Sequence, residues 1–84
     1  MPRIYKFTTY RIAPNATITY QSFAGWSIQV DRKVVGKIER MVPGGSMWAV
    51  DLFGKDYKIE YAFEDAKAVL RRMLERHYPV KETA

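Results

Sequence analysis

Few residues in this chain are of the types that carry out catalysis. It contains one histidine, His77, and no cysteine, which excludes thiol nucleophiles, disulfides and the usual zinc sites. His77 continues the apolar stripe of an expected C-terminal helix, where we expect it to interact with the last helical carbonyls. A general base needs a nucleophile and an orienting acid beside it, and no spacing around His77 provides them. We therefore expect no metal ion and no other cofactor.

The carboxylates and the glycine-rich run have simpler explanations than catalysis. Glu64 and Asp65 are adjacent, so their side chains leave a helix on different sides, and acidic residues suit its first turn. A catalytic pair of Asp51 and Glu60 stays open, although nothing in their spacing favours it. The run Pro43-Gly44-Gly45-Ser46 lies between expected strands and lacks the lysine of a phosphate-binding loop, so we expect a hairpin turn. These patterns predict a protein that is not an enzyme.

Positive charge is concentrated in the first half of the chain. The 84 residues carry 14 Lys and Arg against 9 Asp and Glu, a net charge of +5 at pH 7. Residues 1–42 contain seven of those cations and only two acids, so they hold the whole net charge. Tyrosine, phenylalanine and tryptophan are interleaved with these cations. Cations attract phosphates and aromatic rings stack on unpaired bases, so this half is a candidate nucleic-acid surface.

We expect eight residues to form most of that surface. Six cations would contact phosphates and two tyrosines would stack on bases, namely Arg3, Lys6, Arg11, Lys33, Lys37 and Arg72 with Tyr10 and Tyr20. The alternative is a solubilising coat of scattered cations with half-buried strand aromatics, because a high net charge points to nucleic acid only where the charges cluster in space. The choice between DNA and RNA stays open.

Strands must position most of these side chains. Residues 3–12 and 16–23 are rich in residues that favour pleated structure, and Ala13-Pro14-Asn15 between them predicts a turn and therefore a hairpin. Further alternating runs follow at 26–31, 34–38, 47–53 and 57–61. We expect Val34, Gly36 and Ile38 to share one apolar face. A glycine inside a strand indicates a bulge or a close approach of other atoms, such as Trp26 lying over Gly36.

The apolar period changes at Phe63 from that of a strand to that of a helix. A sheet with one apolar face needs a cover, and this helix is the candidate. The expected fold is α+β, a twisted antiparallel sheet of about five strands with one C-terminal amphipathic helix packed on one face. We expect a single domain over 1–84, with an N-terminal hairpin at 1–24, strands at 25–62, the helix at 63–78 and a tail at 79–84. The expected core is Trp26, Ile28, Val30, Ile38, Trp48, Val50, Ile59, Ala66, Val69, Leu70, Met73 and Leu74.

The segment 25–74 resembles a pattern of small bacteriophage and prophage proteins. The residues that carry the resemblance are Gly25-Trp26, Val34-Val35-Gly36-Lys37-Ile38, Gly44-Gly45 with Trp48, and Phe63 with Ala66-Lys67 and Leu70. Its strand-strand-strand-helix order is similar to the AP2-like, integrase-arm type of DNA-binding domain. That resemblance implies an exposed sheet face in the major groove, carrying Gln29, Lys33, Lys37 and Lys58. The chain departs from the pattern by an added N-terminal hairpin and by acids on the same face, Asp31, Glu39 and Glu60.

These observations favour a small, basic, non-enzymatic module that binds nucleic acid, of phage or mobile-element type. The alternative is a phage-encoded inhibitor or adaptor that binds an acidic host protein surface, in an anti-CRISPR-like or polymerase-inhibitor-like role. It predicts an exposed apolar patch around Met41, Val42 and Met47. An unpaired strand edge allows a homodimer. The first residues lack a secretion signal and no run is long enough to span a membrane, so we expect a cytoplasmic protein with no membrane partner.

Overall fold

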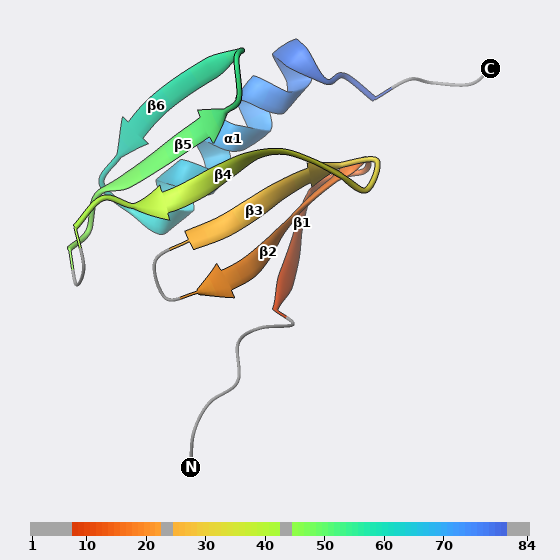
Figure 1. Ribbon diagram of the computed structural model, residues 1–84. Helices are drawn as coiled ribbons and strands as arrows, with labels where there is room; N and C mark the ends of the chain where they lie inside the picture. Colours follow the sequence, from red (N-terminus) through yellow and green to blue (C-terminus); the bar gives the residue numbers. More distant parts are fainter. Residues whose placement is uncertain (1–7, 23–24, 43–44, 81–84) are drawn as a thin grey trace.

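The computed structural model describes residues 8–22, 25–42 and 45–80 of the chain. Within these residues six strands form one antiparallel sheet, and one helix follows them (Figure 1). The expected α+β class is confirmed, but the sheet has six strands rather than about five because each strand-like run forms a strand of its own. The elements are β1 (Thr9–Ala13), β2 (Ala16–Ser22), β3 (Gly25–Val30), β4 (Lys33–Arg40), β5 (Trp48–Leu52), β6 (Asp56–Glu60) and α1 (Phe63–His77).

The sheet is a continuous meander in which each strand pairs with the next along the chain. Such neighbours need only short turns. Asp31 and Arg32 make the turn between β3 and β4, with φ values of 52° and 72°, as a two-residue hairpin that follows the right-handed strand twist requires. The expected N-terminal hairpin is thus part of the sheet, through pairing of β2 with β3. Residues 1–7 and 23–24 of that hairpin, 43–44 of the expected turn and 81–84 of the expected tail lie outside the described residues.

The helix α1 covers one face of the sheet, which we call the inner face; the opposite one is the outer face. It contacts β5 and β6 and also β1, so the sheet curls and brings both of its edges to the helix (Figure 1). Acidic residues lie in its first turn and basic ones in its last, which suits the helix dipole. The Tyr78 N–H closes the last turn on the Leu74 carbonyl at 2.7 Å, and Pro79 then prevents continuation.

The core lies between α1 and the inner face. Ten of the twelve expected core residues are buried there, while Trp26 and Ile59 are only partly buried. The N-terminal hairpin contributes more than we expected. Its buried residues are Ile12, Ala16 and Ile18, and β5 adds Leu52.

A β-bulge in β4 changes which side chains share a face. Ile28 pairs with Gly36, but the next residue, Gln29, pairs with Val34, so Val35 is the extra residue. Val34 therefore lies on the outer face, where 60% of it is exposed. The expectation that Val34 shares the apolar face of Gly36 and Ile38 is wrong for this reason.

Gly36 lies where two strands approach closely. A Cβ atom built on Gly36 would lie 2.1 Å from the Asp51 carbonyl oxygen and 3.1 Å from the Leu52 Cα. The expectation of a bulge or a close approach at this glycine is confirmed. The neighbouring atoms belong to the β5 backbone, however, and not to the Trp26 side chain.

The register of β6 places its charged residues on the inner face. Lys58 pairs with the buried Val50, and Ile59 pairs with Ala49 on the outer face. Residues directly opposite each other on neighbouring strands share a face. Ile59 is therefore not a core residue under α1, and Lys58 does not belong to the outer face on which the DNA-binding resemblance placed it.

Candidate nucleic-acid interface

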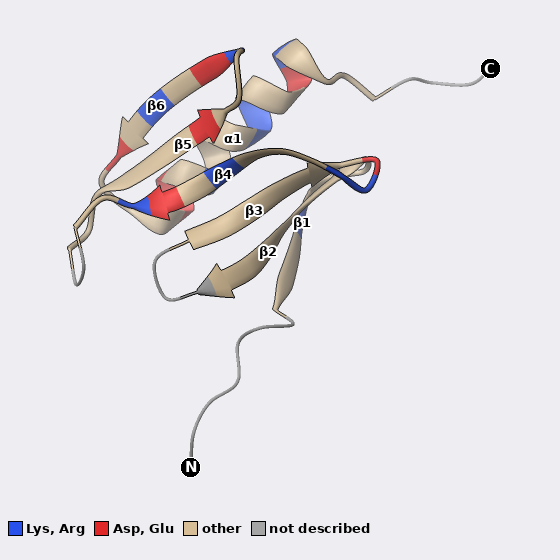
Figure 2. Cartoon of the chain, viewed as in Figure 1, with Lys and Arg blue, Asp and Glu red and all other residues tan. Residues whose placement is uncertain are grey.

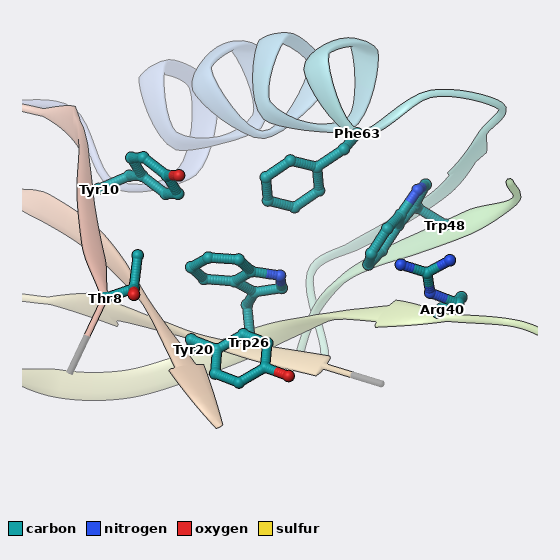
Figure 3. A pocket seen from close by; sticks show the side chains of 7 residues that line it. All are labelled: Thr8, Tyr10, Tyr20, Trp26, Arg40, Trp48 and Phe63. Atoms are coloured by element: carbon teal, nitrogen blue, oxygen red, sulfur yellow. The ribbon is translucent and has the colours of Figure 1, made fainter. Parts of the chain in front are cut away.

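An aromatic pocket opens at the end of the inner face where α1 begins. Its volume is about 550 Å³, and seven residues from β1, β2, β3, β4, β5, the start of α1 and the residue before β1 line it (Figure 3). Five of the seven are aromatic, a composition typical of a site that binds a flat or apolar ligand group. The lining residues are Thr8, Tyr10, Tyr20, Trp26, Arg40, Trp48 and Phe63.

Strand register brings the rings together. Tyr20 pairs with Trp26 across β2 and β3, while Tyr10 reaches the same face from β1 because it pairs with the buried Ile18. Trp26 is the centre of the group, with ring centroids 5.3 Å from Tyr10, 5.1 Å from Tyr20 and 5.1 Å from Phe63. These tilted and edge-to-face contacts are in the range in which aromatic pairs attract. The rings therefore support one another as a preformed wall.

Phe63 links the wall to the helix. It is the first residue of α1, and its ring lies 4.9 Å from that of Trp48 on β5 as well as against Trp26. No helical turn precedes Phe63, so α1 covers the inner face up to this ring and leaves the pocket open beyond it (Figure 3). The helix start thus sets the boundary between the sealed core and the pocket.

Arg40 supplies a positive charge at the pocket. It pairs with Trp48 across β4 and β5, and its guanidinium carbon lies 4.5 Å from the Trp48 ring centroid, a cation–π contact. Its Nη1 donates a hydrogen bond to the Gly45 carbonyl at 2.8 Å. Its Nε is buried without a hydrogen-bond partner, and no carboxylate of the described residues pairs with it. The charge of Arg40 is therefore uncompensated within the described part of the chain.

Lys67 supplies a second cation beside the aromatic wall. Its Nζ lies 4.8 Å from the Tyr10 ring centroid and 5.1 Å from that of Phe63. It also lies 2.9 Å from a carboxylate oxygen of Glu64, one turn earlier in the helix. The two cations thus flank the rings from different elements, Arg40 from β4 and Lys67 from α1.

The structure brings together only some of the residues expected to bind nucleic acid. Tyr10 and Tyr20 both line the pocket. Lys33 lies at the exposed β3–β4 turn, and Arg72 is exposed on α1. Arg3 and Lys6 lie outside the described residues.

The outer face carries the other two expected cations, and its charges are mixed. Arg11 donates to the Pro14 carbonyl at 2.9 Å, and Lys37 pairs with Glu39 at 3.1 Å. Asp51 lies opposite Lys37 on the same face. Positive and negative residues therefore lie side by side on β4 and β5 (Figure 2). The described cations therefore form no single patch on the sheet.

Sequence reasoning missed Arg40 and Lys67 as members of the site. The signal for Arg40 was present, since the alternation through Gly36 and Ile38 continues to Arg40 and places a cation on an apolar face. The sequence places Lys67 on the outward side of the helix with Arg71, Arg72 and Arg76, either as a rim that binds phosphates or an acidic protein groove or as a solvated face. Its place beside Tyr10 depends on how the sheet curls around α1, which the sequence does not display.

The end of α1 away from the pocket holds the only histidine of the chain. His77 Nε2 and Arg76 Nη1 lie 3.1 Å and 2.9 Å from the same Asp56 oxygen. A hydrogen bond from the Tyr57 N–H lowers the pKa of the Asp56 carboxyl below its ordinary value, and His77 and Arg76 lower it further. The partner of His77 is thus a carboxylate of β6 and not a helical carbonyl, which corrects our expectation.

The other candidates for chemistry are dispersed. Asp51 lies on the outer face opposite Tyr57, whereas Glu60 lies opposite Trp48 on the inner face, so these two carboxylates do not form a catalytic pair. The described residues contain no group of three or more His, Cys, Asp or Glu arranged to hold a metal ion. The aromatic pocket is thus the feature of the described chain best suited to bind a ligand.

No family model, curated protein or solved structure matches this chain. Among the described residues, no helix has both the length and the apolar character needed to cross a membrane. The function is therefore argued from the pocket and its charges.

Proposed function

We propose that this protein is a non-enzymatic module that binds single-stranded nucleic acid, with an unpaired base held in the aromatic pocket. The observation that carries the proposal is the pocket itself, in which five aromatic residues and Arg40 converge. Base–aromatic stacking stabilises single-strand complexes by about 1–3 kcal/mol per base.

The charges beside the pocket favour an anionic ligand. Arg40 and Lys67 both lie against its rings, so a cationic ligand of the kind bound by other aromatic cages would be repelled. A nucleotide combines a flat ring with a phosphate, and it matches both the wall and the cations.

The shape of the site favours single strands over duplexes. The rings line a concave pocket rather than a convex ridge, and the bases of a duplex are already stacked inside the helix. The outer face, which could have entered a major groove, carries Glu39 and Asp51 beside Lys37. These carboxylates would meet phosphates unfavourably.

Fluorescence titration tests the proposal, because Trp26 and Trp48 are the only tryptophans of the chain and both line the pocket. We expect single-stranded oligonucleotides to quench this fluorescence and duplexes of the same sequence to bind more weakly. Tyr10→Ala removes one ring of the wall, and Tyr10 is 43% exposed, so the fold should tolerate the change. We expect Tyr10→Ala to weaken single-strand binding about 5- to 150-fold.

Tyr61→Ala is the matched control, because Tyr61 is a more exposed tyrosine, at 68%, that does not line the pocket. It should bind as the unmodified protein does. Equal binding by the Tyr10→Ala and Tyr61→Ala variants, or no binding of any single strand, would refute the proposal.

One observation favours a second candidate, an adaptor or inhibitor that binds an acidic protein surface. Met41 and Val42 are 41% and 57% exposed just after β4, and Met47 nearby is half-buried, so part of the expected apolar patch exists. A complex that survives nuclease and is lost on Val42→Asp, while Tyr10→Ala leaves it intact, would favour this candidate over nucleic-acid binding.

A further inference from the structure

The Arg40 side chain has hydrogen-bonding capacity that the described protein does not use. A guanidinium carries five N–H donors. One nitrogen, Nη1, bonds the Gly45 carbonyl, whereas Nε is buried without an acceptor. Arg40 lines the pocket and is half-buried as a whole, so the donors of its guanidinium tip, rather than the enclosed Nε, are the ones that a ligand in the pocket can reach.

The position of Arg40 is fixed before any ligand arrives. Its guanidinium lies over the Trp48 ring at 4.5 Å, and the bond to Gly45 holds the head group from the other side. Trp48 is itself 7% exposed and contacts Phe63. A guanidinium held in this way loses little conformational freedom on binding, and its planar edge suits the oxygens of a phosphate.

Lys67 does not have the same unused capacity. Its ammonium already lies 2.9 Å from the Glu64 carboxylate, and only 19% of its side chain is exposed. Glu64 thus offsets its charge locally, whereas no described carboxylate offsets that of Arg40. A single phosphate therefore has one preferred position, at Arg40 beside Trp48.

We infer that Arg40 is a phosphate anchor and that the minimal ligand of the pocket is one nucleoside monophosphate unit, its base against the aromatic wall and its phosphate at Arg40. This inference rests on the proposed function and narrows it. The unit can be a free nucleotide or a nucleotide within a strand, since both present the same ring and phosphate.

Binding of small ligands to the whole chain tests the inference. Titrations of uridine monophosphate, uridine and inorganic phosphate are followed by tryptophan fluorescence and by calorimetry. We expect the monophosphate to bind about tenfold to a hundredfold more tightly than uridine, because hydrogen bonds to charged groups contribute about 1.5–3 kcal/mol. Inorganic phosphate alone should bind more weakly than the monophosphate, since it lacks the base.

The decisive measurement is the ratio of the two affinities in Arg40 variants. Arg40→Gln keeps an amide donor for the Gly45 carbonyl but removes the charge, so the ratio of monophosphate to uridine affinity should fall close to one. Arg40→Lys keeps the charge but loses the planar edge, so its ratio should lie between those of Arg40→Gln and the unmodified protein. Arg32→Gln, at the exposed β3–β4 turn, should leave the ratio unchanged.

The outcomes separate this inference from the proposed function. If single strands bind and Tyr10→Ala weakens them, but the affinity ratio does not depend on Arg40, the anchor is refuted and the proposed function stands. If neither strands nor nucleotides bind, both are refuted. If a single-stranded oligonucleotide binds but uridine monophosphate neither binds nor competes with it, the inference that one nucleoside monophosphate unit is the minimal ligand is also refuted. A change in folding alone cannot imitate the expected result, because it would weaken both ligands equally.

Discussion

Gly36 shows how one residue determines the packing of two strands. The Cβ position of this residue lies 2.1 Å from a backbone oxygen of β5, and backbone cannot move aside as a flexible side chain can. We expect Gly36→Ala to lower the free energy of unfolding by at least about 3 kcal/mol, at the upper end of overpacking costs. This loss is a large part of the whole free energy of unfolding of a domain of this size, which is about 4–13 kcal/mol. Urea denaturation followed by circular dichroism measures the change.

Gly54→Ala is the matched control for that substitution. Gly54 has a φ of +73° but open space around its Cβ position, so alanine there meets only backbone strain of about 1–2 kcal/mol. Gly36→Ala should therefore be the more destabilising of the two. Equal losses, or a Gly36→Ala variant as stable as the unmodified protein, would contradict the close approach of β4 and β5.

Single residues of the site were predictable to the extent that their own strand determined them. Tyr10 and Tyr20 were expected to stack on bases, and both line the pocket because they project from β1 and β2 onto the inner face. The expected cations did not join them, since Lys37 lies on the outer face, where Glu39 pairs with it. Charge counted along the chain does not reveal which face a cation occupies.

At the scale of elements, periodicity predicted the strands and the helix, but it did not predict for every residue the face of the sheet on which it lies. Alternation along one strand relates its residues only to one another. The face of Val34 depends on the bulge at Val35, and the face of Ile59 depends on its pairing with Ala49. Both are properties of two strands together, so the composition of either strand alone did not show them.

A cluster of charged side chains fastens the start of β6 to the end of α1. Asp56 accepts from the Tyr57 N–H, and Arg76 and His77 of the helix approach its other oxygen. The lowered pKa of Asp56 means that its ionised form is favoured in the folded state. Its contribution to stability is therefore present above its ordinary pKa of 3.8 and is lost as the pH falls through the lowered value.

We expect Asp56→Asn to remove this pH dependence. The variant should melt at a lower temperature than the unmodified protein at pH 6, and the two should converge as the pH falls through the lowered pKa of Asp56, below which the carboxyl is protonated in both states. Thermal melts across this pH range measure the difference. Glu75→Gln removes an exposed carboxylate of α1 that lies outside the cluster, and it serves as the control. A difference between Asp56→Asn and the unmodified protein that did not shrink as the pH was lowered would contradict a role for the ionised carboxylate.

The whole molecule presents two faces of different character. The outer face has a hydrogen-bonded row of polar side chains, in which Thr17 and Thr19 both donate to Gln29, and mixed charges on β4 and β5. On the inner face, α1 covers the apolar core and leaves the aromatic pocket open. The cations of the described residues are thus distributed over turns, helix and strands, and their effect on a ligand depends on how many of them that ligand reaches.

The salt dependence of the binding constant measures how many cations contact the ligand. For single strands, the logarithm of the binding constant falls with that of the salt concentration with a slope of about −0.7 for each phosphate neutralised. Contacts at Arg40 and Lys67 alone predict a slope of about −1.4, whereas contacts by all six cations expected from the sequence predict about −4. We expect the shallower value for a short oligonucleotide, because Arg40 and Lys67 lie against the rings of the pocket, whereas Lys33 and Lys37 neither line it nor contact its rings. Arg40→Gln should reduce the slope by about 0.7. Tyr10→Ala should weaken binding without changing the slope, since it removes a ring and no charge. A slope near −4 that Arg40→Gln left unchanged would indicate that nucleic acid binds to the dispersed basic surface and not to the pocket.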